Sequence, residues 1–126
     1  MPSFDLGRAR RWDVVILPFP YSDRFAEKRR PALVISDDVL HRQYELLWVV
    51  MITSATNQGW GCDVAITDLK RAGLPAPSVV RAAKIASIEP RRVLRRAGQL
   101  PTTDAARVER ALIELLNLST GARRGR

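Results

Sequence analysis

A short basic segment leads directly into an apolar stretch in the first third of the chain. Lys28, Arg29 and Arg30 precede Pro31, and residues 32–35 are Ala-Leu-Val-Ile. Pro31 fixes its own φ and biases Arg30 toward an extended conformation, so Arg30 enters the predicted strand at a defined angle. A guanidinium at the rim of an apolar core needs an anionic partner, and a phosphate group would be one. The plainer interpretation is a solvated basic run.

A second candidate lies where another apolar stretch ends. Residues 46–52 are Leu-Leu-Trp-Val-Val-Met-Ile, and Thr53 and Ser54 follow with hydroxyl side chains. Taken alone, this change from apolar to polar residues is typical of a strand that turns into a loop. Its significance depends on its combination with the Arg30 segment.

Histidine and cysteine chemistry is restricted by composition. The chain has one histidine, His41, and one cysteine, Cys62. These counts exclude a histidine-pair acid–base mechanism, a disulfide within the chain and a multi-thiolate metal site. We expect His41 on a surface loop and Cys62 as an inert buried thiol.

Metal and phosphate-loop motifs are weak. Asp37 and Asp38 are adjacent, and neighbouring strand residues point to opposite faces, so a strand-ending turn is favoured over a Mg²⁺ site. Residues 59–61, Gly-Trp-Gly, lack the lysine and third glycine of a phosphate-binding loop and predict a tight turn. We therefore predict no bound metal and no cofactor.

The composition favours one compact domain with an anionic partner. The chain has 126 residues, 46% of them hydrophobic, and a formal net charge of +8. This charge favours nucleic acid, an acidic protein segment or a membrane surface as partner. The apolar runs are far shorter than a bilayer span, and no signal-peptide pattern precedes Asp13, so we expect a soluble, cytoplasmic protein with no membrane contact.

Hydrophobic periodicity predicts short strands followed by one helix. The expected strands are residues 13–17, 31–36, 46–53, 62–67 and 78–88. A hydroxyl cap and an acidic first turn at residues 101–104 predict the start of a helix whose apolar stripe runs to about residue 116. We expect no crossover helix between the strands, so the fold class is α+β, a small antiparallel β-barrel with a C-terminal α-helix. The predicted organisation is a flexible basic arm (1–11), a barrel domain (12–118) and a basic tail (119–126).

The order of these motifs resembles a known family. Residues 14–23 (Val-Val-Ile-Leu-Pro-Phe-Pro-Tyr-Ser-Asp) and 28–36 (Lys-Arg-Arg-Pro-Ala-Leu-Val-Ile-Ser), followed by Thr53-Ser54, are similar to the opening of the MazF/PemK toxin endoribonucleases. Residues 78–81, 84–85 and 89–93 and the C-terminal helix continue the similarity. The family commonly has glycine before the aspartate of its first strand, where this chain has Trp12.

The resemblance implies an SH3-like barrel that forms homodimers and cleaves single-stranded RNA without a metal. Its catalytic arginine and threonine fall on Arg30 and Thr53. In the implied reaction the RNA 2′-hydroxyl attacks the phosphorus and gives a 2′,3′-cyclic phosphate and a 5′-hydroxyl, and the identity of the general base stays open. It further implies a cognate antitoxin with an acidic segment that covers the RNA groove.

Supporting residues are predicted on the same basis. Basic side chains would follow the RNA backbone, and we assign this role to Lys28, Arg29 and Lys84. Ser54 would add a donor near the scissile phosphate. Phe19 or Tyr21 would stack on an unpaired base, or else hold their own loop closed. Trp60 lies in a loop that could influence which RNA sequence is cut.

Three alternatives remain at this point. One is a non-catalytic toxin of the same fold that acts by binding a protein, like the CcdB gyrase poisons. Another is a plain RNA-binding module, which the charge alone supports. The third, a metal-dependent nuclease, would need clustered carboxylates that the sequence does not offer.

Overall fold

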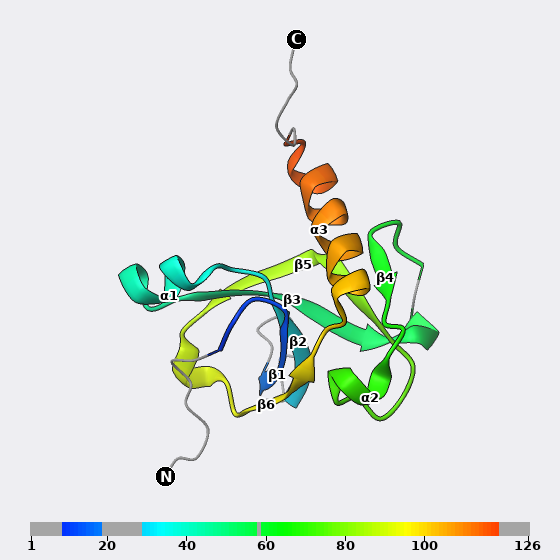
Figure 1. Ribbon diagram of the computed structural model, residues 1–126, viewed down its shortest axis with the longest axis horizontal. Helices are drawn as coiled ribbons and strands as arrows, with labels where there is room; N and C mark the ends of the chain where they lie inside the picture. Colours follow the sequence, from blue (N-terminus) through cyan, green and yellow to red (C-terminus); the bar gives the residue numbers. More distant parts are fainter. Residues whose placement is uncertain (1–8, 19–28, 58, 119–126) are drawn as a thin grey trace.

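The structure is a computed structural model that describes residues 9–18, 29–57 and 59–118 (Figure 1). The strands are β1 (Asp13–Pro18), β2 (Arg29–Val34), β3 (Leu47–Ser54), β4 (Asp63–Ala65), β5 (Ser78–Ile88) and β6 (Arg95–Gln99). The helices are α1 (Asp38–Tyr44), α2 (Leu69–Ala72) and α3 (Thr102–Leu116), with the short 3-10 helices η2 (Ala55–Asn57) and η3 (Pro90–Arg92). Most of the predicted arm, and the predicted tail, lie outside the described residues.

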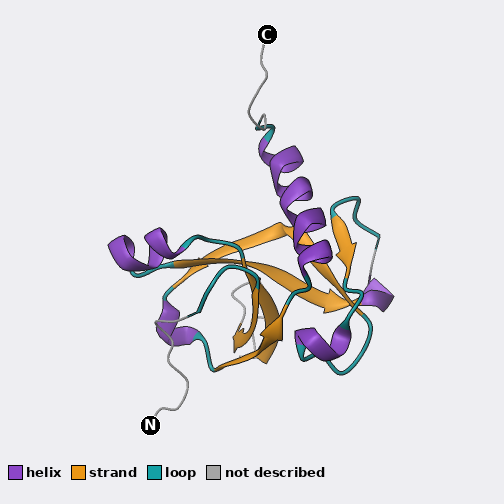
Figure 2. Ribbon diagram, in the orientation of Figure 1, coloured by secondary structure: helices purple, strands orange, loops and turns teal. Residues whose placement is uncertain are grey.

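The strands form one antiparallel sheet in the order β4-β5-β3-β2-β1-β6. The α+β class is therefore confirmed, with a C-terminal helix packed on the sheet (Figure 2). The barrel prediction is met only in part, because the outer strands β4 and β6 are not paired with each other in the described ranges. In addition, α1 and α2 interrupt segments that we expected to be helix-free, although the strands on either side still pair antiparallel.

Helix α2 lies against β6 and so covers part of the gap between the outer strands. Two glycines make this approach possible. A Cβ at Gly73, which has a φ of +75°, would lie 2.0 Å from the carbonyl oxygen of Ala97. A Cβ at Gly98 would lie 2.3 Å from the carbonyl oxygen of Arg71. The α2 turn and β6 are thus in direct backbone contact, which any larger residue would prevent.

Strand alternation gives the sheet two apolar faces. The first face contains Val14, Leu33, Val50, Ile52 and Val80 and packs under α3, which contributes Val108 to the same cluster. The second contains Val15, Leu17, Ala32, Val34, Val49 and Ile88. Neighbouring residues of one strand fall on opposite faces, as the pleat requires. None of the described helices is both long and apolar enough to cross a membrane.

A buried carboxylate attaches α3 to the sheet. The predicted hydroxyl cap does not form, because Pro101 stands at the N-cap position without a side-chain hydrogen bond. Instead, fully buried Asp104 accepts hydrogen bonds from the backbone N–H of Thr67 (2.8 Å), from the Thr67 hydroxyl (3.1 Å) and from Arg107. The acidic first turn therefore serves a tertiary contact to the segment after β4.

Trp12 has an unusual backbone conformation at the entry to β1. Its φ is +76°, a left-handed value that non-glycine residues rarely adopt. Its N–H donates to the carbonyl of Val34 (2.7 Å), and its carbonyl accepts from the N–H of Leu100 (2.9 Å). Its side chain packs against the first apolar face, so this strained residue connects β2, β1 and the segment that leads into α3.

Candidate functional site

Arg30 and Thr53 lie at the same end of two adjacent strands. The β1–β2 ladder pairs Arg30 with Leu17, and the β2–β3 ladder runs from Val34–Val49 to Ala32–Met51. The ladder ends at the pair Ala32–Met51, so Arg30 and Thr53 each lie two residues beyond the last pair, on the same side of it.

Strand alternation places both side chains on one face of the sheet, because Arg30 lies two residues from Ala32 and Thr53 two residues from Met51. Leu17 and Ala32 belong to the second apolar face, and Met51 packs against it. Arg30 and Thr53 follow the same alternation and so stand at its margin, each half-buried. The Nε of Arg30 is buried and has no hydrogen-bond partner among the described residues. An unsatisfied guanidinium donor at a rim is suited to an oxyanion.

The hydroxyl of Thr53 is held by a residue that the sequence did not single out. The side-chain N–H of Asn57 donates to Thr53 Oγ1 over 3.1 Å. Asn57 ends η2, which follows β3 directly, and the N–H of Ala55 in the same turn donates to the carbonyl of Pro77 (3.0 Å). The turn after β3 is thus hydrogen-bonded both to the end of β3 and to the residue that precedes β5.

A buried ion pair stands next to this turn. Arg81 donates from Nε and Nη2 to the two carboxylate oxygens of Asp63, each over 2.9 Å, and their side chains are only 9% and 7% exposed. Nη2 of Arg81 also donates to the backbone carbonyl of Asn57 (2.8 Å). The hydrogen bonds from Arg81 lower the pKa of Asp63, against the opposing effect of burial, with help from the N–H groups of Trp60 and Gly59. Asp63 in turn raises the pKa of Arg81.

An aromatic ring lies beside the pair. The guanidinium carbon of Arg81 is 4.4 Å from the ring centroid of Trp60, and Nζ of Lys84 is 5.9 Å from it. These are cation–π distances. Trp60 is nonetheless 46% exposed, so the loop presents an aromatic surface near the candidate site.

The other predicted residues divide into two groups. Arg29 and Ser54 are described and exposed, but alternation directs them to the opposite face from Arg30 and Thr53. The hydroxyl of Ser54 is bonded to Thr56 Oγ1 (2.9 Å). The RNA-contact roles of these two residues stay predictions. Phe19, Tyr21 and Lys28 lie outside the described residues.

Asn57, Asp63 and Arg81 were missed as site residues. A signal for two of them is present in the sequence, since Arg81 and Asp63 each stand inside an apolar strand pattern, at Val-Val-Arg-Ala and Asp-Val-Ala. A charge of each sign within predicted strands indicates a buried pair. Nothing local marks Asn57, because its role depends on how the turn folds back.

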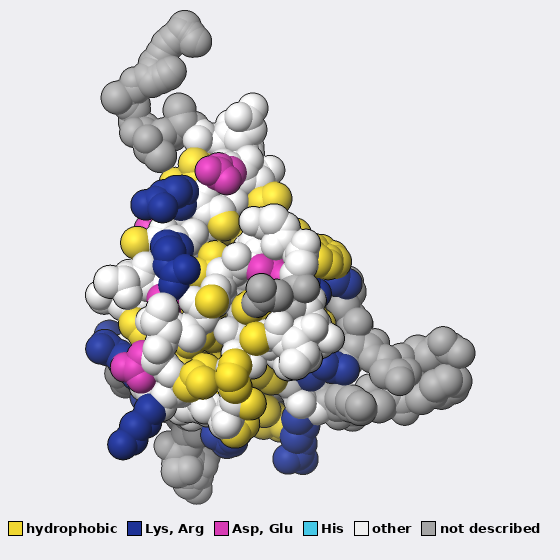
Figure 3. Space-filling model, turned by 90° about the vertical axis from the view of Figure 1, so that its right-hand side faces the viewer, with side chains coloured by type: hydrophobic (Ala, Val, Ile, Leu, Met, Phe, Trp, Pro, Cys, Tyr) yellow, Lys and Arg dark blue, Asp and Glu magenta, His cyan; other side chains and the backbone are white. Residues whose placement is uncertain are grey.

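Basic side chains surround the end of the molecule that carries α2, β4 and the end of β3. Figure 3 shows Lys and Arg side chains around the margin of this face, apolar atoms toward its centre and few acidic groups. A surface on which one sign of charge predominates attracts ligands of the other sign.

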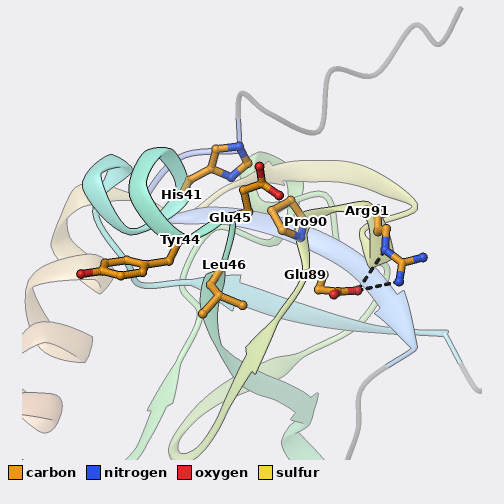
Figure 4. Close-up of a pocket in the computed structure, with 7 residues that line it drawn as sticks. All are labelled: His41, Tyr44, Glu45, Leu46, Glu89, Pro90 and Arg91. Atoms are coloured by element: carbon orange, nitrogen blue, oxygen red, sulfur yellow. Dashed lines mark hydrogen bonds and ion pairs between the residues drawn. The ribbon is translucent and has the colours of Figure 1, made fainter.

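A pocket at the other end of β3 and β5 is different in character. It is lined by α1, Leu46 and η3, and Arg91 is already paired with Glu89 there (2.7 Å; Figure 4). His41 lies in α1, not on the expected loop, and its Nδ1 is buried without a partner in the described ranges. No group of three or more His, Cys, Asp or Glu side chains suited to a metal occurs in the described part of the chain.

The fold is a small α+β sheet with a C-terminal helix, and a family comparison identifies the class to which it belongs. The model of the "PemK-like, MazF-like toxin of type II toxin-antitoxin system" family matches residues 10–116. The chain therefore belongs to this family, and the recognition from sequence is confirmed. A search of the curated proteins finds no match.

Solved structures give the same relationship. MazF from Deinococcus radiodurans (Form-I) is 26% identical with a TM-score of 0.70, over 87% of this chain and 97% of that one. A MazE–MazF structure from the same organism (Form-II) is 26% identical with a TM-score of 0.68, over 88% and 97%. An endoribonuclease in complex with its cognate antitoxin from Mycobacterial species shares the fold, with 18% identity, a TM-score of 0.71 and coverage of 89% and 98%.

Proposed function

We propose that this chain is a metal-independent endoribonuclease that cleaves single-stranded RNA, with Arg30 and Thr53 as its catalytic residues. The observation that carries the proposal is the position of Arg30: it is half-buried, its Nε has no partner among the described residues, and it lies at the same end of the sheet as Thr53 on the neighbouring strand. Membership of a toxin family and similarity to a structure titled an endoribonuclease support the activity class.

The proposed reaction uses a nucleophile that the RNA itself provides. The 2′-oxygen forms a bond to phosphorus and loses its proton to a base, while the bond from phosphorus to the 5′-oxygen breaks and that oxygen takes up a proton. The products are a 2′,3′-cyclic phosphate and a 5′-hydroxyl. This route needs charge stabilisation and in-line geometry but no activated water.

Arg30 is suited to the charge that develops. The guanidinium is always protonated and offers fixed donors, so it stabilises the doubly negative pentacoordinate phosphorus and can hydrogen-bond the departing oxygen. Thr53, at the same end of the neighbouring strand, would hold a phosphate oxygen or the attacking hydroxyl in place. The basic margin of this end of the molecule (Figure 3) would attract the RNA backbone.

The test is cleavage of a long unstructured RNA in EDTA by wild type, Arg30→Ala and Arg29→Ala. Removing one donor to a transition-state oxyanion lowers the rate by about 100-fold or more, so we expect this loss for Arg30→Ala. Arg29→Ala removes the same charge from the opposite face and tests the predicted contact with the RNA backbone, for which we expect a much smaller loss, of at most about threefold, near that of one screened surface charge. End analysis should show cyclic phosphates.

Other outcomes would contradict the proposal. Equal rates for Arg30→Ala and wild type would refute the catalytic assignment. Cleavage that EDTA abolishes would indicate a metal nuclease, and RNA binding without cleavage would indicate a binding module. Gyrase inhibition without RNA cleavage would point to a protein-directed toxin.

We also propose an acidic antitoxin and a second copy of the chain as partners. The MazE–MazF structure is a toxin–antitoxin assembly of a relative, and the basic margin of this chain suits an acidic segment. For the dimer, the supporting feature is an apolar groove between α3 and β5, whose exposed large residues include Trp48, Ile85, Leu115 and Leu116. Exposed patches of this kind mark association surfaces.

The dimer is tested by light scattering on the purified protein. Leu115→Glu places a charge in the groove and should shift the mass from dimer to monomer. Leu94→Glu changes an equally exposed leucine outside the groove (44% against 51%) and should leave the dimer intact. A monomeric wild type would contradict the proposal.

A further inference from the structure

We infer that Asn57 is a positioning residue that makes Thr53 a hydrogen-bond donor to the scissile phosphate. The inference rests on the proposed function and assigns one part of it, the role of the Thr53 hydroxyl. Its basis is the 3.1 Å hydrogen bond in which Asn57 Nδ2 donates to Thr53 Oγ1.

The direction of this bond restricts the hydroxyl. A threonine hydroxyl carries one hydrogen and two acceptor sites, and an amide N–H can only donate. When Asn57 occupies one acceptor site, the hydroxyl hydrogen must point elsewhere. Within the described ranges Thr53 Oγ1 has no second partner, so its hydrogen is available to an oxygen that binds from outside the protein. The incoming N–H also polarises the O–H and strengthens it as a donor.

Asn57 is itself fixed by a chain of contacts that begins in the interior. The buried Asp63 carboxylate holds Arg81 through two bonds, and Arg81 holds the Asn57 carbonyl over 2.8 Å. The same carboxylate accepts from the N–H groups of Gly59 (3.2 Å) and Trp60 (3.3 Å) on the far side of the turn. The loop after β3 is therefore closed around a buried ion pair, and the Asn57 amide is the element of that loop that bonds to the site hydroxyl.

This arrangement selects between two roles for Thr53. A hydroxyl that is hydrogen-bonded by an amide N–H is a poorer proton acceptor and a better donor. Thr53 therefore donates to a non-bridging phosphate oxygen, beside the Arg30 guanidinium, and does not take the proton of the attacking 2′-hydroxyl. The neighbouring Ser54 cannot substitute for it, because its hydroxyl is engaged with Thr56 and alternation turns it to the other face.

The experiment compares Asn57→Asp and Asn57→Ala in the full-length protein. Aspartate has nearly the same shape, but its carboxylate only accepts, so it would draw the Thr53 hydrogen away from the RNA. We measure the single-turnover cleavage rate and the RNA dissociation constant separately, in EDTA. We expect Asn57→Asp to lower the cleavage rate by about 30-fold or more and Asn57→Ala by about 5- to 10-fold, the scale of one hydrogen bond.

Repeating both changes in a Thr53→Ala background distinguishes an effect that Asn57 exerts through the Thr53 hydroxyl from an effect on loop structure or on charge. If Asn57 acts through the hydroxyl, neither change should lower the residual rate by more than about twofold there, because coupled residues are not additive. The Thr53→Ser variant, which keeps the hydroxyl, should retain the sensitivity to Asn57→Asp. Asn57 is exposed, so the variants should unfold in urea at nearly the wild-type midpoint.

Two results would overturn the inference alone. An Asn57→Asp variant as fast as wild type would mean that the side-chain oxygen accepts from Thr53. An equal loss with and without Thr53 would mean that Asn57 only shapes the loop or that the new charge repels RNA. A wild-type protein that does not cleave RNA would instead refute the proposed function, and the inference with it.

Discussion

Two buried aspartates, Asp63 and Asp104, show how similar chemistry serves different ends of the molecule. Each carboxylate accepts from an arginine and from a backbone N–H. The arginine of the first pair, Arg81, is 9% exposed and continues to the carbonyl of Asn57. The arginine of the second, Arg107, is 40% exposed and continues to the carbonyl of Ala65. The hydrogen bonds of the first pair therefore lead to the candidate site, and those of the second lead to the junction of α3 with the sheet.

The difference in burial decides what each pair does when it is broken. Loss of Asp63 leaves a guanidinium without its anion inside the protein. Loss of Asp104 leaves Arg107 able to turn to water, so the main loss is the bond to the Thr67 N–H. A buried pair close to a site is thus both more costly to break and more closely tied to activity.

The largest effect is expected for Asp63→Ala. Removing one partner of a buried ion pair costs about 3–5 kcal/mol, and the turn that carries Asn57 loses its anchor. Urea unfolding should show the lower stability, and single-turnover cleavage under folding conditions should fall as well. The double variant Asp63→Leu/Arg81→Met removes both charges and should recover much of the stability but not the activity. Equal stability of the single and double variants would contradict this account.

The effect of Asp104→Ala should be smaller than that of Asp63→Ala and should be confined to stability. Hydrogen bonds to a charged group contribute about 1.5–3 kcal/mol, so we expect a loss of about 2–3 kcal/mol in urea unfolding. The cleavage rate of the folded protein at low temperature should stay within about twofold, since coupling between distant sites is small. A drop in rate as large as that of Asp63→Ala would remove the distinction between the two pairs.

Acidification should weaken the Asp63 pair by a smaller amount. Its pKa in the folded protein lies below 3.8, the ordinary value, so its contribution is fully present above that pH. It is lost as the pH falls through the lower folded pKa, since the unfolded chain then binds the proton more readily. Between about pH 6 and pH 2, the free energy of unfolding measured in urea should fall more steeply for wild type than for Asp63→Asn. Parallel curves would show that Asp63 does not carry this dependence.

The smallest effect is expected for Arg107→Ala. Its side chain is 40% exposed but its partner Asp104 is fully buried, so the change leaves a buried carboxylate that keeps only its bonds from Thr67, at a cost of about 1.5–3 kcal/mol for one lost bond to a charged group. The matched change at the buried arginine, Arg81→Ala, should cost more in urea unfolding, because it removes two bonds to Asp63 and the bond to the Asn57 carbonyl. Similar losses for the two arginines would show that burial does not separate the pairs.

The strand pattern was predicted well where burial enforces it. The apolar segments 13–17 and 78–88 correspond closely to β1 and β5, because short, mostly apolar runs bounded by turn residues are typical of strands that are buried on both faces. Strand β6, with the sequence Arg-Arg-Ala-Gly-Gln, was missed because it is polar and depends on its pairing with β1. Helix α1 was missed for a related reason, since none of its residues is fully buried.

Only the candidate residues that lie on strands were identified from the sequence, and the polar network beside them was not. The apolar runs and Pro31 assigned the two strands, and the family resemblance then singled out Arg30 and Thr53, whose catalytic roles stay predictions. That Asn57 bonds to Thr53, or that Asp63 meets Arg81, depends on the register of β4 on β5 and on a turn that folds back. The register of two strands joined by a segment that contains α2 is not encoded in local pattern, and the polar network therefore appears only in three dimensions.

Trp12 has a consequence for how this position can vary among related chains. Its backbone conformation would suit glycine without strain, yet its indole fills volume against the core under α3. Replacing Trp12 with glycine would relieve the backbone strain but would leave a cavity too large for the neighbouring side chains to fill. Exchange at residue 12 is thus coupled to the size of the side chains on α3, and the two should change together in evolution.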